Sequence, residues 1–303
     1  MNKSYRKWSV DNDAQKHIKQ AIHLNFKDDK PIEFTFPFGG YKLWRLASYP
    51  EVDWAEFFTI SYYSRYVSPI LKVYKPGVNF TFSSDDVIIE RMDNIPKEDT
   101  DAYFRSFQKL IFEFSKHYPD NMKMNITRVG DLYSQKEFEN ELAENVEKVK
   151  NHYINEGEER KKKMLKTSKL NIKFKGAEDW TKLSKEEQQA KIAMGPIYHD
   201  AHCSLSKRRD FVRGKNKVVL FTTPISNAIA IGTSKSSITK FWTGTGILEK
   251  RNGDYKDRIL SPQQIKALEK LEKEALKIDL IPLKNFNKIT IVKEKLNFSN
   301  KSK

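Results

Sequence analysis

Strand-like runs alternate with amphipathic segments along the first part of the chain, and this alternation most limits the folds it can adopt. Apolar residues recur at helical spacing in three segments, 11–24, 53–74 and 98–117. Short runs of strand character lie between and after them, at 31–36, 78–82 and 122–129. Strands that alternate with helices of this length build βαβ units, so the sequence predicts an α/β fold whose sheet contains parallel strands.

The remaining segments carry weaker signals. We expect a further short strand at Val87–Ile89, because the run is rich in β-branched residues. Later strands are expected at 218–221, 228–231, 237–242 and 289–292. A helix is expected over 262–277, and the segment around His199–Cys203 reads as an extended run.

A change of composition divides the chain. From 134 to 191 glutamate and lysine dominate and large apolar residues are few, which predicts a charged helical insertion. We therefore expect the α/β domain to have a first part over 1–133 and a second part over 192–297, with a disordered tail at 298–303.

Cysteine content and hydropathy indicate the compartment. Cys203 is the only cysteine among 303 residues, so no intrachain disulfide can form. The first ten residues are polar and charged, unlike a secretory signal. The apolar runs are shorter than the roughly 20 residues that span a bilayer. These features predict a soluble, cytoplasmic protein without a membrane partner.

The loop after the first predicted strand is the strongest candidate for a binding site. Residues 36–42 read Phe-Pro-Phe-Gly-Gly-Tyr-Lys. Gly39 and Gly40 allow the backbone to approach a ligand closely, and Lys42 adds a cation. The following helix begins at Asp53, and Glu56 stands three residues on, where either a catalytic carboxylate or an ordinary capping box would place it.

Other groups could carry chemistry, although common signatures such as G-x-G-x-x-G and the P-loop are missing. Imidazoles and a thiol at His199, His202 and Cys203 are possible zinc ligands, but polar or substrate contacts explain them better. Hydroxyls and cations suited to a phosphate or carboxylate gather at Ser204, Ser206, Lys207, Arg208, Arg209 and, in a second loop, Lys235. Asp85, in the acidic segment 83–86, suits either a proton shuttle or an ordinary turn.

The order of these segments resembles the isocyanide (isonitrile) synthase family, also called the pyoverdine/dityrosine biosynthesis family. That family has a Phe-Pro loop with lysine, a Pro-Asp-x-x-Glu helix start, a Pro-Gly strand entry and a Ser-Asp-Gly loop. The corresponding residues here lie at 36–42, 50–56, 74–78 and 83–86, within roughly the first 120 residues. Asp86 replaces the family's glycine, and Glu51 replaces its aspartate. In the second half, 201–208 and 240–242 only echo the family pattern.

The resemblance implies a Rossmann-like fold with an added helical part and a specific reaction. In that reaction the amino group of an aromatic amino acid joins the keto carbon of a pentulose phosphate such as ribulose 5-phosphate, and that carbon becomes the isonitrile carbon. No metal or other cofactor is implied, and a downstream oxygenase is a potential pathway partner. We expect Lys42, Glu56 and Asp85 to serve catalysis, with Lys207, Arg208 or Arg209 binding anions.

The positive charge supports an alternative from another class. A formal net charge of +15 favours contact with phosphate backbones, so the protein could bind nucleic acid through its basic insertion on a catalytically silent scaffold. A solvated lysine surface explains the same charge without any partner.

Overall fold

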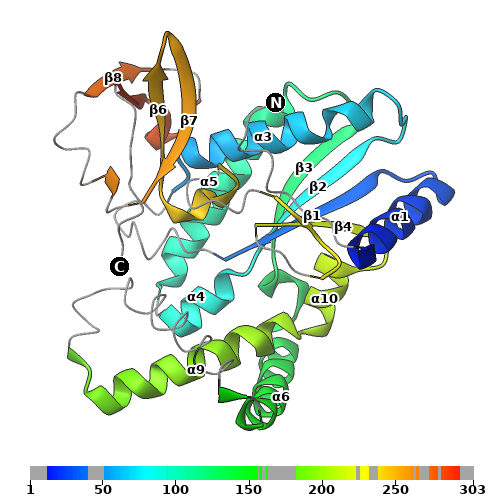
Figure 1. Ribbon diagram of the computed structural model, residues 1–303, viewed down its shortest axis with the longest axis vertical. Helices are drawn as coiled ribbons and strands as arrows, with labels where there is room; N and C mark the ends of the chain where they lie inside the picture. Colours follow the sequence, from blue (N-terminus) through cyan, green and yellow to red (C-terminus); the bar gives the residue numbers. More distant parts are fainter. Residues whose placement is uncertain are drawn as a thin grey trace.

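A computed structural model shows two β-sheets and a helical layer (Figure 1). The residues that it describes are 12–39, 51–93, 95–155, 157–158, 162, 182–222, 226–231, 238–261, 264–265, 273–278 and 281–293. Within these ranges, every helix is too short or too polar to cross a membrane.

The larger sheet has five strands, all parallel. They are β1 (Ile32–Phe38), β2 (Val78–Ser84), β3 (Met122–Arg128), β4 (Lys217–Phe221) and β5 (Ile229–Ala230). Their order across the sheet is β3-β2-β1-β4-β5. This arrangement confirms the prediction of a Rossmann-like α/β fold. The strand order reverses between β1 and β4, and in open α/β sheets ligands bind beyond the carboxyl ends of the strands at such a point.

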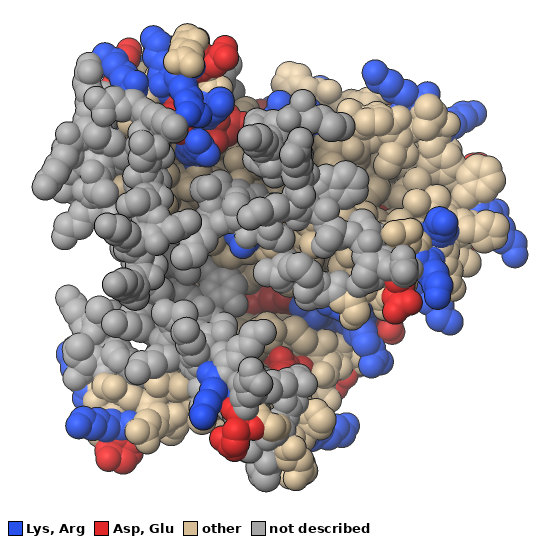
Figure 2. Space-filling view, in the orientation of Figure 1, with Lys and Arg blue, Asp and Glu red and all other residues tan. Residues whose placement is uncertain are grey.

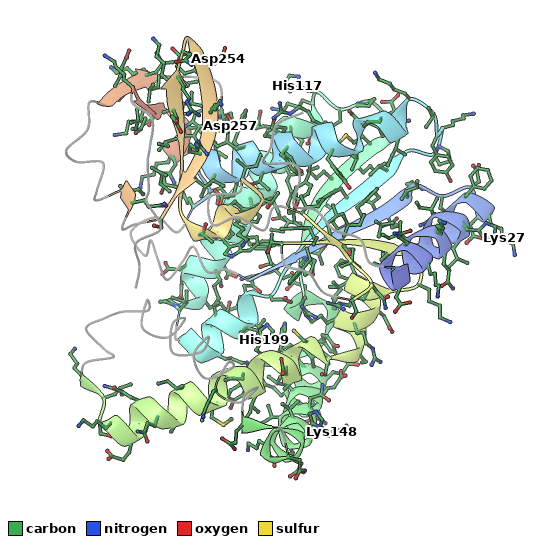
Figure 3. All side chains as sticks on the ribbon, viewed as in Figure 1. Lys27, His117, Lys148, His199, Asp254 and Asp257 are labelled. Atoms are coloured by element: carbon green, nitrogen blue, oxygen red, sulfur yellow. The ribbon has the colours of Figure 1, made fainter. Side chains whose placement is uncertain are left out.

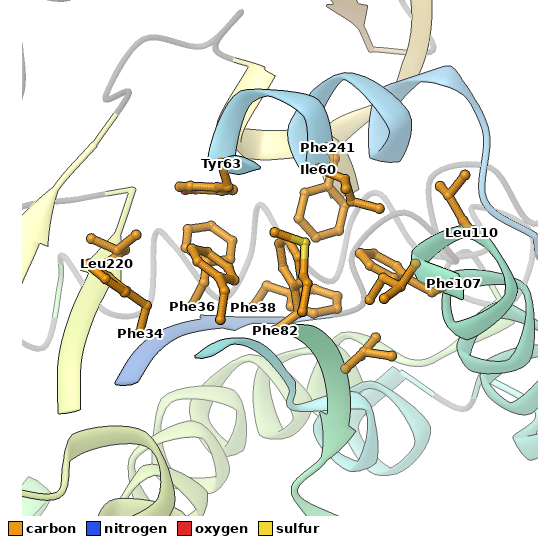
Figure 4. Close-up of a cluster of buried hydrophobic side chains, with 14 of the residues drawn as sticks. Phe34, Phe36, Phe38, Ile60, Tyr63, Phe82, Phe107, Leu110, Leu220 and Phe241 are labelled. Carbon is orange, nitrogen blue, oxygen red and sulfur yellow. The ribbon is translucent and has the colours of Figure 1, made fainter. Parts of the chain in front are cut away.

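One face of this sheet is covered by α3 (Trp54–Leu71) and α5 (Lys97–Ser115). Alternate residues of β1 are phenylalanines, so Phe34, Phe36 and Phe38 all point to this face. Phe36 packs on Tyr63 of α3 with ring centroids 5.1 Å apart, and Phe38 packs on Phe107 of α5 at 6.1 Å (Figure 4). The alternation in the sequence therefore places the aromatic core.

The opposite face of the sheet is polar. Glu33 of β1 receives hydrogen bonds from Asn79 of β2, at 3.0 and 3.1 Å, and pairs with Lys217 of β4 at 3.2 Å. The helices α1 (Asn12–Lys27) and α10 (Ser206–Arg213) contact β1 and β4. The hydroxyl of Thr35 donates to the carbonyl of Val212, at 2.6 Å, and so ties α10 to β1.

A helical layer lies below the sheet in Figure 1 and has its own small core. It contains α4 (Asp86–Asp93), α6 (Gln135–Ile154) and α9 (Lys185–Cys203), with the 3-10 turn η2 (Gly130–Leu132) leading into it. The buried residues of this core are Phe138, Leu142, Val146, Ile197, Ala201 and Leu205. The charged helices α6 and α9 thus each bury an apolar stripe in this core.

The second sheet was not predicted, although one of its strands was expected, at 289–292. It consists of β6 (Thr245–Arg251), β7 (Asp254–Leu260), β8 (Lys273–Lys277) and β9 (Lys288–Val292), in the order β7-β6-β9-β8. Short 3-10 turns, η3 (Ile238–Thr243) and η5 (Lys284–Phe286), flank it. The β6-β7 hairpin turns at Asn252-Gly253, which have φ of 51° and 84°. An Asn-Gly pair is a strong hairpin signal, so these strands could have been found from the sequence.

Four secondary-structure predictions are wrong. Val87–Ile89 belongs to α4. Val87 packs into the small helical core and Ile89 into the main core, and residues two apart point to different sides of a helix but to the same face of a strand. Residues 238–242 form η3 rather than a strand. Lys273–Lys277 was predicted as the end of a helix but forms the strand β8, whose backbone pairs with β9. His199–Cys203 is the last turn of α9, not an extended run.

Candidate active site

The carboxyl end of β2 carries two adjacent aspartates. Ser84 ends the strand, Asp85 follows it, and Asp86 is the first residue of α4. The amide of Asp85 donates a hydrogen bond to the carbonyl of Phe38, the last residue of β1, at 2.9 Å. The two loops that the sequence singled out, 36–42 and 83–86, therefore begin side by side at one edge of the parallel sheet.

Asp85 collects side chains from two later helices. Its carboxylate accepts from Arg208 Nε, at 2.8 Å, and from Arg208 Nη2, at 2.6 Å. His202 Nε2 lies 3.1 Å from the same carboxylate. All three side chains are buried. The structure thus brings together three residues that sequence analysis placed in separate groups.

Burial and pairing act in opposite directions on this triad. Burial alone would raise the pKa of Asp85, but the Arg208 guanidinium and the His202 hydrogen bond hold it well below its usual range. Burial lowers the pKa of His202 more than the Asp85 carboxylate raises it, so the imidazole is neutral at pH 7. Asp85 is therefore a fixed negative charge, which argues against its expected use as a proton shuttle.

Asp86 has a different arginine. Arg128, the last residue of β3, donates from Nε to the Asp86 carboxylate and from Nη1 to Asp101 of α5. Its Nη2 donates to Thr100, at 2.9 Å, and lies 3.6 Å from Glu90. Sequence analysis missed Arg128, although a charged residue at the carboxyl end of a predicted parallel strand is a signal for this edge of the sheet.

The basic segment around α10 is largely engaged by protein groups. Ser206 donates from its amide and its hydroxyl to Glu141 of α6, at 2.6 and 3.1 Å. Tyr133 accepts from the amides of Lys207 and Arg208, at 2.7 and 3.3 Å. These contacts fill the start of α10, where an anion was expected to bind.

Some side chains near the start of α10 are also engaged by protein groups, and others lie at the surface. Lys207 pairs with Glu137 at 3.2 Å, and the Ser204 hydroxyl donates to the Asp200 carbonyl at 2.8 Å. Arg209 is exposed, and its side chain makes no ion pair with the described residues. Of the three cations at 207–209, Arg209 and the half-exposed Lys207 lie at the surface, whereas Arg208 is buried.

Glu56 is fully buried in a capping box. It accepts from the amide of Asp53, at 2.8 Å, while Asp53 accepts from the amide of Ala55, at 2.7 Å. Its other oxygen accepts from the hydroxyl of Tyr103 on α5, at 2.9 Å. The described contacts of Glu56 do not include Asp85. Glu56 therefore has the capping role that its spacing from Asp53 allowed.

The other histidine of α9, His199, is exposed to solvent. His199 lies one helical turn from Cys203, with Nε2 and Sγ 3.9 Å apart, and Figure 3 shows its place on the helix. The hydrogen bond with Asp200, at 3.1 Å, raises the pKa of the His199 imidazole. His202 points elsewhere, into the buried contact with Asp85, so helical geometry separates the two imidazoles. The described residues contain no group of three metal-ligating side chains.

Several predicted site residues lie beyond what the structure describes. Gly39 is described and directly follows β1, where it is half-buried. Gly40, Lys42 and Lys235 fall outside the described residues.

Comparisons with known proteins identify the fold. No family model matches the sequence, and no curated protein matches it significantly. Among solved structures, the crystal structure of the PvcA protein from Pseudomonas aeruginosa superposes with a TM-score of 0.62 over 90% of this chain and 91% of that chain, at 15% sequence identity. The whole arrangement, with its helical layer and second sheet, is therefore similar to PvcA in fold.

Proposed function

We propose that this chain is a distant isonitrile-synthase-like enzyme that joins the amino group of an aromatic amino acid to a pentulose phosphate such as ribulose 5-phosphate. The observation that carries the proposal is the fold similarity to PvcA, an isocyanide synthase, over nine-tenths of both chains. The sequence motifs that resemble this family add independent support, because two of them meet at the carboxyl edge of the parallel sheet.

The chemistry requires a cation for the sugar phosphate, a positioned carboxylate and groups that move protons. Lys42 and Lys235 are proposed as cations, together with Lys207 and Arg209 at the surface of α10. We propose that Asp85, oriented by Arg208 and His202, is a fixed negative charge that acts on the substrate amine through its electrostatic field rather than by direct contact. No metal is required for these roles.

Four residues have smaller parts in the proposal. The backbone at Gly39 and Gly40 lies in the loop that would approach the ligand, since glycine adds no side chain there. Ser204 sits at the end of α9 beside His202. Glu56 is proposed mainly as a capping residue, because both of its oxygens already accept hydrogen bonds.

Nucleic-acid binding is less well supported. Two arginines, Arg128 and Arg208, are buried in ion pairs and cannot reach a phosphate backbone. On the face seen in Figure 2, lysine and arginine side chains are spread over several elements, with acidic side chains among them. A polyanion-binding surface normally gathers cations into one patch or stripe.

Incubation with tyrosine or tryptophan and ribulose 5-phosphate tests the proposal. We expect an isonitrile that needs both substrates, detected by mass spectrometry and by the infrared absorption of the N≡C stretch. Lys42→Ala should abolish turnover with little change in melting temperature. Lys27→Ala is the control, because Lys27 ends α1 in an exposed position (Figure 3). No product and no stabilisation by the sugar phosphate would reject the proposal.

A further inference from the structure

We propose that Asp86, rather than Asp85, is the carboxyl group that takes up and releases a proton in this site. The inference deepens the proposed function, on which its catalytic part rests. Its proton-binding part rests on the geometry of the two neighbouring aspartates and can be tested without turnover. The two carboxyl groups adjoin in the chain, yet each has its own arginine.

Asp85 is unsuited to bind a proton. Both of its oxygens accept from the same guanidinium, in the two-pronged arrangement that matches a carboxylate, and His202 lies at one of them. Protonation would break at least one of these buried contacts. The Arg208 guanidinium serves no other carboxylate among the described residues, so its positive charge balances Asp85 alone.

Asp86 is held differently, because only one of its oxygens has a hydrogen-bond partner among the described residues. Oδ2 accepts from Arg128 Nε, whereas Oδ1 is buried and without a hydrogen-bond partner in the described part of the chain. The residue as a whole is 4% exposed. A buried carboxylate oxygen with no donor is costly, and a proton on it would remove the charge that makes it so.

Arg128 cannot neutralise all the acids around it. It contacts Asp86 and Glu90 on α4 and Asp101 on α5, so three carboxylates share one guanidinium. Lys97 of α5 relieves only Asp101, at 2.9 Å. Asp85 adds a further negative charge next door. Binding of one proton by the three carboxylates around Arg128 is therefore favourable, and Asp86 is the most buried of these three.

The titration of Asp86 follows from this arrangement. Burial raises its pKa to about 6, and Glu90 and Asp85 add to the rise, while Arg128 opposes it. The two adjacent aspartates are thus pushed in opposite directions, as in sites where one carboxylate stays charged and the other exchanges a proton. In the proposed reaction, the neutral Asp86 would donate its proton to the hydroxyl of the carbinolamine as the C–O bond breaks and water leaves, and would regain a proton from the nitrogen as the C=N bond forms.

Proton binding can be measured through thermal stability. The proton affinity of Asp86 should be about 100-fold higher in the folded than in the unfolded chain, since its pKa rises from about 3.9 to about 6. We expect the melting temperature of the wild type, relative to Asp86→Asn, to fall as pH rises from 4 to 6. Asp120→Asn is the control, because Asp120 is exposed. Parallel curves for wild type and Asp86→Asn would overturn the proposal.

A spectroscopic measurement covers the case in which Asp86→Asn does not fold. With aspartate carbons isotopically labelled, the infrared band of a protonated carboxyl group should be present in the wild type at pH 5 and disappear with a midpoint near pH 6. No protonated aspartate at pH 5 would overturn the proposal.

The catalytic part is tested separately on the wild-type reaction. If isonitrile forms, kcat/KM should show an ionisation near pH 6 that Asp86→Asn lacks. An unchanged pH profile would reject the catalytic role of Asp86 and leave the proposed function intact. Absence of product and of stabilisation by the sugar phosphate, together with divergent stability curves, would reject the proposed function and support Asp86 as the proton-binding residue.

Discussion

Asp85 and Arg208 are 123 positions apart in the chain, yet the carboxylate of one accepts two hydrogen bonds from the guanidinium of the other, at 2.8 and 2.6 Å. The contact connects the end of β2 to the start of α10 and therefore joins the two halves of the sheet. The basic segment 204–209 is therefore not a free anion site, because Arg208, its most buried cation, already pairs with a carboxylate.

Removal of Arg208 should strongly lower the free energy of unfolding. Arg208→Ala leaves Asp85 buried without its partner, and breaking such a pair costs about 3–5 kcal/mol. The free energy of unfolding from urea titrations measures the loss. Arg209→Ala is the matched control, since Arg209 is exposed on the same helix and should change stability by less than about 0.5 kcal/mol. Equal effects of the two variants would contradict the importance of the pair.

The same pair should make stability depend on pH at the acid end. The pKa of Asp85 is lowered in the folded state, so the carboxylate stabilises the fold fully above its unfolded pKa of about 3.9, and this contribution declines as pH falls below about 4 and is lost only as pH falls through the lowered folded pKa. Asp85→Asn should therefore be much less stable than the wild type at pH 7, and the difference should be smaller at pH 3. Urea titrations at both values decide this, with the exposed Asp131→Asn as control. A difference independent of pH would be inconsistent with an ionised Asp85.

Glu56 and Tyr103 should be energetically coupled. Each single change, Glu56→Ala or Tyr103→Phe, removes their 2.9 Å hydrogen bond, so the double variant should cost less than the sum of the two. We expect a coupling of about 1–2 kcal/mol from a double-mutant cycle in urea. Tyr118→Phe in place of Tyr103→Phe is the control, because the Tyr118 hydroxyl pairs with Ser64. Additive effects would show that the capping box does not depend on Tyr103.

Gly246 should be required for docking of the second sheet. A Cβ at this position would lie 2.3 Å from the amide of Ala55 and from the carbonyl carbon of Trp54, so β6 could no longer pack on the start of α3. We expect Gly246→Ala to cost about 3 kcal/mol, the upper range for overpacking. Gly253→Ala, in the open hairpin turn with φ of 84°, should cost only about 1 kcal/mol for its backbone conformation. Thermal denaturation compares the two, and a smaller loss at Gly246 would refute the docking.

Local patterns predicted much of the parallel sheet. Phe34, Phe36 and Phe38 stand at every second position of the run, and this period of two identifies both the strand and its aromatic face. Asp53 and Glu56 mark the start of α3 by their spacing alone. Val87–Ile89 misled the prediction because β-branched residues favour strands, whereas here two separate cores require a helix.

The sequence by itself determined the α/β class, the position of several strands and helices, and the acidic and basic segments at the sheet edge, because hydrophobic period and capping are properties of neighbouring residues. Only the tertiary structure decided which acid meets which cation. Asp85 pairs with Arg208 and Asp86 with Arg128 because the strand order places the ends of β1, β2 and β3 together while α10 returns to β1. Such pairings depend on contacts between residues far apart in the chain, and these set the different charge states of two neighbouring aspartates.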